Sequence, residues 1–409
     1  TDISLPSNSI NQSTTGTNAF VGTLSTTDAD TGDSHTYSLV SGTGDANNGS
    51  FNINGNTLRT SSALAAGNYS VRINTNDGTD DFAKQFTITV VDNVAPAPPS
   101  TPDLATTSDT GNESTTTGAT SDNLTNDLTP TFSGTAEANA TVTIISSVEG
   151  TLGTTTANGS GNWSFTPSGN LSMGSFNITA TATDAANNTS SSSSALSISI
   201  DATQPTITLS SVEASVTNGD INGEIPVTFT FNEEVDGFKA NDITFGGTAN
   251  TNLVALSFQS ADSTTFTAKF KPTNDGSLFI QVNSAVATDL AGNNNTAATQ
   301  LNFTFDSTDP IINAVSLAAN NSYIDVTFSE SVYDTSSSFG ALEASDFNLS
   351  LSGGTATSPS VTSVTAIGGG ALTGGETTVR VNFSVTGTIN GAETLEVDLG
   401  SNAVYDAAG

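Results

Sequence analysis

Apolar and polar residues alternate along many short stretches of the chain. Successive side chains of a β-strand point to opposite faces, so this alternation predicts strands with one buried face. The strands are expected over residues 69–73, 86–90, 176–182, 196–200, 227–231, 278–282, 301–305, 324–328 and 379–383. No stretch shows a convincing amphipathic helical period, and a single helical turn is expected within residues 341–347.

Two short strings recur at one offset. The string DATQP at 201–205 returns as DSTDP at 306–310, and DAANN at 184–188 returns as DLAGN at 289–293. Both shifts are 105 residues (306 − 201 and 289 − 184), and a third copy, DAAG, stands at 406–409. A shared offset at two separate strings predicts a tandem array of similar domains with carboxylates at fixed places.

Alternating strands that end in Asp and are followed by proline mark three domain boundaries. They predict domains over residues 1–93, 94–202, 203–310 and 311–409, the last of them truncated at its C-terminus. Short strands with many Gly, Asn and Ser turn formers favour thin sandwiches of two sheets. The expected fold class is all-β, with four tandem β-sandwich domains in an extended array. The chain is expected to be a piece of a longer secreted protein.

The composition excludes several kinds of chemistry. The chain has 409 residues, no cysteine and a net charge of −33, from 40 acidic and 7 basic residues. Without cysteine there are no disulfides, zinc–thiolate sites or thiol catalysis. The negative charge argues against nucleic acid as a partner, and no apolar run has the length needed for direct membrane insertion. The charge is explained either by solubility in a salty medium or by bound divalent cations, and cations are favoured for carboxylates at repeated positions.

Residues 1–93 resemble a bacterial cadherin-like repeat. The resemblance is carried by VGTLSTTDAD at 21–30, YSL at 37–39, FNI at 51–53 and VVD at 90–92. It implies calcium ligands at Asp28, Asp30 and Asp77. The sequence departs from the family at 62–67, where SALAAG replaces the acidic motif that usually follows the middle strands.

The other three predicted domains resemble bacterial Ig-like repeats of large surface adhesins. Residues 94–202 carry TPTFSGTAE at 129–137, GNWSFTP at 161–167 and ATDAA at 182–186. The two later domains share VTFTFNE at 227–233 and VTFSE at 326–330. Together, the resemblances imply the extender region of a giant (RTX-type) bacterial adhesin, with one cadherin-like and three Ig-like repeats.

Acidic residues recur at three kinds of position on a seven-stranded sandwich. They follow strand B, follow strand F, or lie in the linker after strand G, and these positions meet where a linker enters the next domain. The expected junction sets are Asp92 with Glu137 and Asp184, Asp201 with Glu233 and Asp289, and Asp306 with Glu330 and Asp406. Asp309 is a further linker acid, beside Asp306. Asp28, Asp30 and Asp77 hold the corresponding positions of the first domain.

Carboxylates that converge without a Lys or Arg partner repel one another, and a hard cation relieves that repulsion. Calcium (Ca2+) takes six to eight oxygen ligands at about 2.3–2.6 Å. Backbone carbonyls and Asn93, Asn188 or Asn293 can complete its shell. Magnesium, which demands octahedral geometry, is the second choice. The competing explanation is that these acids cap turns, because Asp and Asn form Asx-turns readily.

No catalytic pattern stands out, and the chain is not expected to be an enzyme. His35 is the single histidine; it lacks a nucleophile context and is expected on the surface. Trp163 lies in an alternating stretch and is expected in a core. The glycines at 368–370 and 374–375 lack the helix and lysine of a phosphate loop and fit a long hairpin loop.

The main functional hypothesis is a calcium-stiffened stalk of a bacterial cell-surface adhesin. Its expected partners are calcium ions, the neighbouring repeats of the same polypeptide, and cell-surface or self-association partners. Two alternatives stay open. One is a structural subunit of a surface filament or surface layer, which needs a pairing edge or face. The other is an accessory carbohydrate-binding region of a secreted enzyme, for which one Trp and five Tyr offer little aromatic surface.

Overall fold

A computed structural model of the chain is all-β, as predicted. The structure describes residues 1–30, 32–111, 122–212, 216–217, 224–253, 257–336, 339–401 and 403–407. Contacts divide the chain into two compact units, residues 1–202 and 203–409, and each unit is described by itself. Each unit contains two separate apolar cores, and each core lies within one β-sandwich. The domain boundaries expected from the sequence stay a prediction.

The described residues form short 3-10 turns. These are η1 (Gln12–Thr14), η2 (Asn48–Ser50), η4 (Ala240–Asp242) and η5 (Ala344–Asp346). The helical turn predicted within residues 341–347 is η5. In the part of the chain that the structure describes, no helix has the length and apolar character to cross a membrane.

The first sandwich has one four-stranded sheet, which is packed against shorter strands. Its strands are β1 (Asp2–Ser4), β2 (Ser9–Asn11), β3 (Phe20–Thr23), β4 (Ser25–Thr27), β5 (Thr36–Leu39), β6 (Phe51–Asn54), β7 (Thr57–Thr60), β8 (Gly67–Asn76) and β9 (Asp81–Val91). The larger sheet has the order β2-β9-β8-β5, and the other strands form β3-β7-β6 and the pair β1-β4. Leu58 of β7 and Val71 and Ile73 of β8 lie in the core between them.

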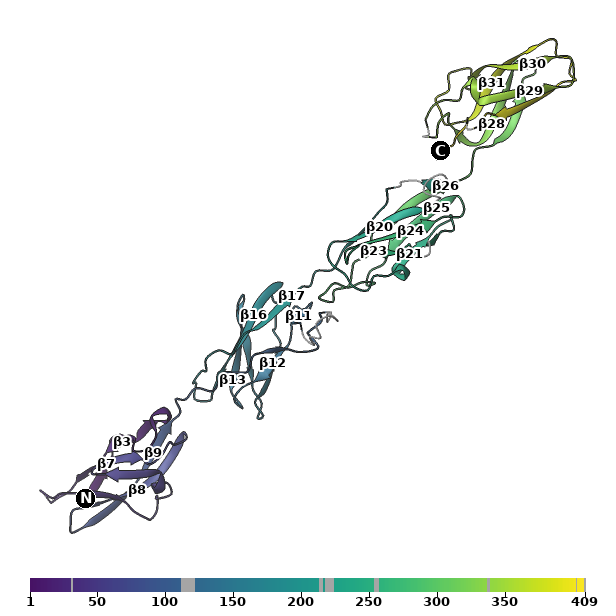
Figure 1. Ribbon diagram of the computed structural model, residues 1–409. Coiled ribbons are helices and arrows are strands. Elements are labelled where there is room, and N and C mark those ends of the chain that lie inside the picture. Colours follow the sequence, from purple (N-terminus) through teal and green to yellow (C-terminus); the bar gives the residue numbers. More distant parts are fainter. Residues whose placement is uncertain are drawn as a thin grey trace. The chain divides into compact units, whose positions relative to one another are not determined.

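The second sandwich has sheets of three and five strands. Its strands are β10 (Asp103–Leu104), β11 (Leu124–Thr125), β12 (Phe132–Thr135), β13 (Thr141–Ser146), β14 (Gly150–Thr156), β15 (Asn162–Phe165), β16 (Gly174–Thr183) and β17 (Leu196–Ile200). The sheet orders are β10-β12-β15 and β11-β17-β16-β13-β14, and Figure 1 shows β11 beside β17. Trp163 of β15 is buried in the core, as predicted.

The third sandwich has a core rich in phenylalanine. Its strands are β18 (Ile207–Ser210), β19 (Val216–Thr217), β20 (Ile225–Phe231), β21 (Ile243–Gly246), β22 (Asn252–Leu253), β23 (Gln259–Ser260), β24 (Thr265–Lys271), β25 (Gly276–Val282) and β26 (Leu301–Asp306). One sheet is β18-β20-β24-β22, with β23 also on β24, and the other is β19-β26-β25-β21. The ring of Phe238 is part of this core, 5.8 Å from Phe229, 5.3 Å from Phe231 and 5.0 Å from Phe266, measured between ring centroids.

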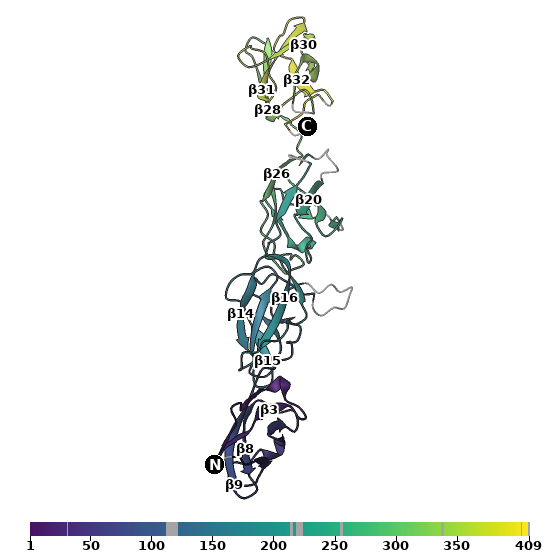
Figure 2. The same ribbon diagram turned by 90° about the vertical axis from the view of Figure 1, so that its left-hand side faces the viewer.

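The fourth sandwich has sheets of four and two described strands. Its strands are β27 (Ile312–Leu317), β28 (Tyr323–Val332), β29 (Phe347–Ser352), β30 (Thr357–Thr365), β31 (Glu376–Thr386) and β32 (Thr394–Leu399). The sheet orders are β27-β28-β31-β30 and β29-β32. In Figure 2, β28 and β31 lie on one side of this sandwich and β32 on the other. The glycines at 368–370 and 374–375 lie in the hairpin loop between β30 and β31, as predicted.

In each of the first three sandwiches, the N-terminal segment contributes a strand to both sheets. In each case an early strand pairs antiparallel within one sheet: β1 with β4, β10 with β12, and β18 with β20. The next short strand then pairs in parallel with the last strand of the sandwich: β2 with β9, β11 with β17, and β19 with β26. The chain therefore crosses from one sheet to the other before the main strands begin.

The stretches of alternating polarity all form strands. They lie in β8, β9, β16, β17, β20, β25, β26, β28 and β31. Along β25, for example, Leu278, Ile280 and Val282 are buried while the residues between them are not. Burying one face of each strand between two sheets is what the two-residue period dictates.

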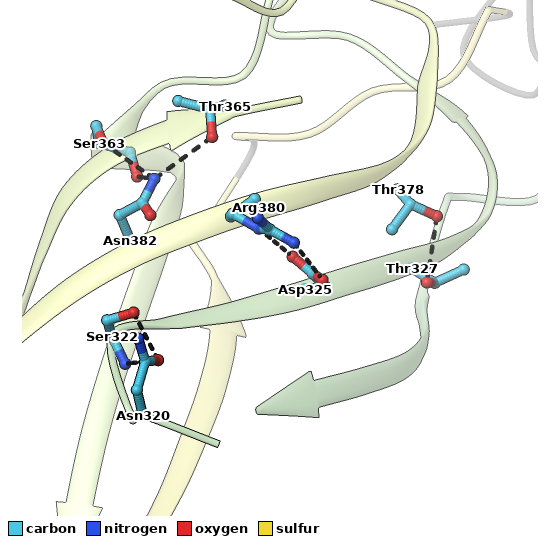
Figure 3. A network of polar contacts seen from close by, with 9 residues as sticks. All are labelled: Asn320, Ser322, Asp325, Thr327, Ser363, Thr365, Thr378, Arg380 and Asn382. Atoms are coloured by element: carbon cyan, nitrogen blue, oxygen red, sulfur yellow. Dashed lines mark hydrogen bonds and ion pairs between the residues drawn. The ribbon is translucent and has the colours of Figure 1, made fainter. Parts of the chain in front are cut away.

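The outer face of the fourth sandwich's larger sheet is held by polar contacts (Figure 3). Arg380 of β31 donates from Nε and Nη2 to the two carboxylate oxygens of Asp325 on β28, at 2.8 and 2.9 Å. Its guanidinium also lies 3.6 Å from the ring centroid of Tyr323. Asn382 of β31 donates to Ser363 Oγ of β30 at 3.1 Å. These contacts join three neighbouring strands on the solvent side of the sheet.

Replacing Phe229 with Ala is expected to destabilise the third sandwich by about 3–5 kcal/mol, because it empties a fully buried ring position in a packed core. Phe339→Ala in the fourth sandwich removes an exposed ring and serves as the control. Calorimetry of the full chain should show one transition at lower temperature for F229A and unchanged transitions for F339A. Equal effects of the two substitutions would contradict this placement of the core.

Candidate metal centres

Asp289 and Asp406, aspartates that follow strand F, each come directly after a residue in an isolated antiparallel β-bridge. Thr288, which precedes Asp289, exchanges backbone hydrogen bonds with Asp236 at 2.7 and 3.1 Å. Tyr405, which precedes Asp406, does the same with Tyr333 at 2.7 and 2.9 Å. Each bridging partner stands three residues after a glutamate, Glu233 or Glu330 respectively. The bridges therefore bring the loop after strand F to the glutamate near the end of strand B.

The Asp and the Asn of the repeated Asp-x-x-x-Asn string are hydrogen-bonded to each other. Asp289 Oδ1 accepts from the backbone N–H of Asn293, and Oδ2 accepts from Asn293 Nδ2, both at 2.8 Å. Asp184 and Asn188 make the same two contacts at 2.8 and 2.9 Å. The residue before each Asn has a positive φ, 91° at Gly292 and 70° for the asparagine at 187, and glycine and asparagine adopt this conformation most easily. The string thus fixes one aspartate at the tip of the domain.

Asp306, Glu330 and Asp406 form a carboxylate triad in the second unit. Each offers an oxygen within 4.8 Å of the others. Asp406 is buried and the other two are partly buried. Asp306 ends β26 of the third sandwich, whereas Glu330 and Asp406 belong to the fourth. These three residues are a set that the repeats predicted to converge.

Glu330 does not follow strand B, as the sequence suggested, but lies inside β28. The pairing of β28 with β31 shifts there, from Thr327 opposite Thr378 to Val332 opposite Glu376. Three extra residues of β28 are accommodated in this irregularity. A bulge of this kind redirects a side chain that a regular strand would point elsewhere.

The triad gathers negative charge in a partly buried place. Burial raises the pKa of Asp306, and the nearby charges of Asp406 and Asp275 raise it further. Burial likewise raises the pKa of Glu330, together with the charges of Asp306, Asp406 and Asp275. Carboxylate oxygens that are partly buried and close together are the donor set of a hard divalent cation such as Ca2+.

Asp275 is a fourth acid near this triad, and the sequence reasoning missed it. It lies in the turn before β25, and its carboxylate accepts from Ser307 N at 2.8 Å and Ser307 Oγ at 2.9 Å, and from Thr308 Oγ1. These contacts hold the start of the linker that follows Asp306. The sequence offered no signal, because an exposed turn acid looks the same whether or not a distant linker docks on it.

In the third sandwich, Glu233 and Asp289 offer carboxylate oxygens within 4.8 Å of each other. Asp289 is buried and Glu233 is partly buried. Asp201, the expected third member, lies near the end of the first unit, where its backbone N–H donates to Thr125 O at 2.9 Å. That Asp201 joins this pair stays a prediction. Asp309 is exposed and belongs to no acidic triad in the described residues.

Asp92, Glu137 and Asp184 do not meet as a triad. Instead, the Nδ2 of Asn188 donates to Asp184 Oδ2 at 2.9 Å and to Asp92 Oδ1 at 3.4 Å. Glu137 is exposed, and it belongs to no acidic triad among the described residues. At this junction the amide of Asn188 links the two aspartates.

Asp28, Asp30 and Asp77 also form no triad within the described residues. Asp77 accepts from the backbone N–H groups of Asp80 and Thr79, at 2.8 and 2.7 Å, and these bonds lower its pKa to about 2. Asp28 accepts from Thr1 Oγ1 at 2.7 Å and from Asp30 N at 3.3 Å. The geometry here matches the turn-capping role that the sequence left open.

Two protein-family models match the middle of the chain. A bacterial Ig-like domain model matches residues 96–202, and another bacterial Ig-like domain model matches residues 201–305. Residues 96–305 form two bacterial Ig-like domains. The cadherin-like character of residues 1–93 and the Ig-like character of residues 311–409 stay predictions. A search of curated proteins found no match.

Solved structures with tandem sandwiches are similar to this chain at low identity. A biofilm-associated protein (BSP domain) is 16% identical with a TM-score of 0.19, over 49% of this chain and 30% of that chain, so this chain spans less than a third of its length. A tetra-tandem repeat in the extending region of a large adhesion protein is 18% identical with a TM-score of 0.26, over 96% and 89%. An ectodomain fragment of ICAM-5 is 13% identical with a TM-score of 0.29, over 99% of both chains.

Asn293→Ala is expected to destabilise the second of the two bacterial Ig-like domains by about 1–3 kcal/mol, because it removes a hydrogen-bond donor from the buried carboxylate of Asp289. Asn188→Ala is the matched control in the first Ig-like domain, where the equivalent aspartate is only partly buried. The loss of stability, measured by calorimetry in EGTA, should be larger for N293A. A larger effect of N188A would contradict the role assigned to burial.

Glu330→Gln is expected to raise the melting temperature of the metal-free chain at neutral pH. The raised pKa values of Asp306 and Glu330 mean that the folded state binds protons more readily than the unfolded state. Their contribution to stability is therefore most favourable at low pH and declines as pH rises from the usual carboxyl range through the raised values. E330Q should weaken the decline of stability with rising pH. Glu396→Gln, at an exposed position of β32, should leave this decline unchanged. A lower melting temperature for E330Q in EGTA would refute the unfavourable effect of burial and neighbouring carboxylates on Glu330.

Proposed function

We propose that this chain is a non-enzymatic, extracellular segment of a bacterial cell-surface adhesin, in which calcium at the junctions holds neighbouring sandwiches in a fixed orientation. The observation that carries the proposal is the triad of Asp306, Glu330 and Asp406, to which two successive sandwiches contribute. The match of residues 96–305 to bacterial Ig-like domains supports a place in a tandem surface protein. Its partners under this proposal are calcium ions, neighbouring repeats and molecules at the cell surface.

The donor atoms of the triad favour calcium among common cations. All three side chains are carboxylates, and hard cations prefer oxygen ligands. Soft and borderline metals prefer thiolate and imidazole, but the chain has no cysteine and its one histidine, His35, lies in the first sandwich. Calcium also tolerates irregular geometry and variable ligand number, whereas magnesium requires a near-ideal octahedron.

The residues of the triad couple ion binding to the junction. Asp306 ends β26, and the linker from it passes through Pro310 into β27. Glu330 is fixed within β28, and the bridge between Tyr333 and Tyr405 fixes the position of Asp406. If all three side chains hold one ion, β26 cannot turn relative to β28 without losing a ligand. The bound ion brings positive charge to the three carboxylates.

The repeat extends the proposal to a second centre. Glu233 and Asp289 stand in the same relation to their bridge as Glu330 and Asp406 do to theirs. Asp201 precedes Asp306 by 105 residues (306 − 201), so it holds the same place in its linker. We propose that Glu233 and Asp289 bind a second cation, and a contribution from Asp201 stays a prediction of the repeat.

Calcium titration of the full chain tests the proposal. A calcium concentration of one hundred times Kd should stabilise the folded state by about 2.7 kcal/mol if binding is confined to it. The melting temperature should rise in calcium, return in EGTA, and rise less in magnesium. Asp406→Asn should abolish most of the response of the fourth sandwich, and Glu396→Gln should retain it.

Small-angle scattering in calcium and in EGTA gives the second readout. Removing calcium should broaden the distribution of inter-domain orientations, because the linker and the next sandwich then no longer bind a common ion. If both the melting curve and the scattering profile are the same in calcium and EGTA, the junction proposal is wrong.

A further inference from the structure

One side chain holds the linker after β26 to the third sandwich. The ladder between β25 and β26 ends where Gly276 lies opposite Phe305. Asp275 and Asp306 are the next residues of the two chain segments, beyond the last pair of that ladder. On the side of β25, backbone pairing therefore stops just before the aspartate that enters the triad.

The carboxylate of Asp275 takes over where that pairing stops. Its Oδ1 accepts from the backbone N–H and the hydroxyl of Ser307, at 2.8 and 2.9 Å, and its Oδ2 accepts from the hydroxyl of Thr308. Hydrogen bonds to an ionised carboxylate are stronger than those between neutral groups. Both oxygens are engaged with the linker, and Asp275 is not a member of the acidic triad.

Thr308 connects Asp275 to the triad. Its hydroxyl donates to Asp275, and its backbone N–H donates to Asp306 Oδ1 at 3.3 Å. Together the two contacts hold the carboxylate of Asp306 in relation to the turn before β25. A ligand whose orientation is fixed before an ion binds loses less conformational freedom on binding, so groups behind a ligand contribute to affinity.

The preceding repeat lacks the side chains of this arrangement. Strand β16 begins with Gly174 as β25 begins with Gly276, and both glycines have a positive φ, 111° and 141°. The residue before Gly174 is Met173, and Ala202 holds the place of Ser307 in the repeated linker string. The carboxylate and the serine hydroxyl thus occur together in one repeat and are replaced together in the other.

We propose that Asp275 is a positioning residue for the ion of the carboxylate triad. Through Ser307 and Thr308 it fixes the direction of the linker, and with it the carboxylate of Asp306, before the ion binds. This role rests on the junction proposal, because it presupposes an ion at the triad. The rival explanation is that Asp275 acts only through its negative charge, which attracts a nearby cation whatever the geometry of the linker.

An uncharged isostere separates the two explanations. In Asp275→Asn the amide oxygen can still accept from Ser307, and the amide N–H can donate to the hydroxyl oxygen of Thr308. Asp275→Ala removes the charge and all of these contacts.

Calcium affinity is measured by isothermal titration calorimetry on the full chain carrying Asp289→Asn, which suppresses the second centre. D275A should bind calcium at least about tenfold more weakly than the chain with Asp275. D275N should recover most of that loss and lie within about threefold of the same reference.

Thr308→Val tests the connection to Asp306 without changing any charge. It removes the hydroxyl and keeps the shape of the side chain, so calcium binding should weaken. Thr304→Val, at an exposed position of β26, is the matched control and should leave the affinity unchanged. A merely structural role of Asp275 would lower the melting temperature equally in calcium and in EGTA without changing the affinity.

Unchanged affinity in D275A or in T308V would overturn the positioning role, and so would an equal loss in D275N and D275A. Each of these results leaves the junction proposal in place. If the chain shows no calcium binding, or if Asp406→Asn retains all of it, the junction proposal and the positioning role both fail.

Discussion

The burial of one thin apolar layer between two sheets is the interaction on which the rest of this structure depends. The chain has no cysteine, so no disulfide reinforces its small sandwiches, and each must be held by its own core. The long strands contribute alternate side chains to that layer, as Val71, Phe229 and Val326 do. Charged residues are thereby excluded from the inner faces of strands, and the carboxylates gather in loops, linkers and bulges.

Carboxylates at those places fall into two physical classes. The oxygens of Asp77 and Asp184 accept hydrogen bonds from nearby N–H groups, and these bonds lower their pKa values. Asp306 and Glu330 are partly buried beside other carboxylates, which raises their pKa values. The first class stabilises turns without any ion, whereas the second is costly unless a cation is bound. Both classes look alike in the sequence, because each is an acidic residue after a strand.

The sequence by itself determined the strands, the all-β class and the repeated placement of Asp201, Asp289 and Asp306, because a two-residue period and a fixed offset are local properties. The tertiary structure alone decided which acids meet. It placed Glu330 inside a bulge of β28, set Asp275 against Ser307, and separated Glu137 from its expected partners. Such distances depend on the backbone of loops and on register shifts between paired strands, and neither leaves a periodic trace in the order of residues.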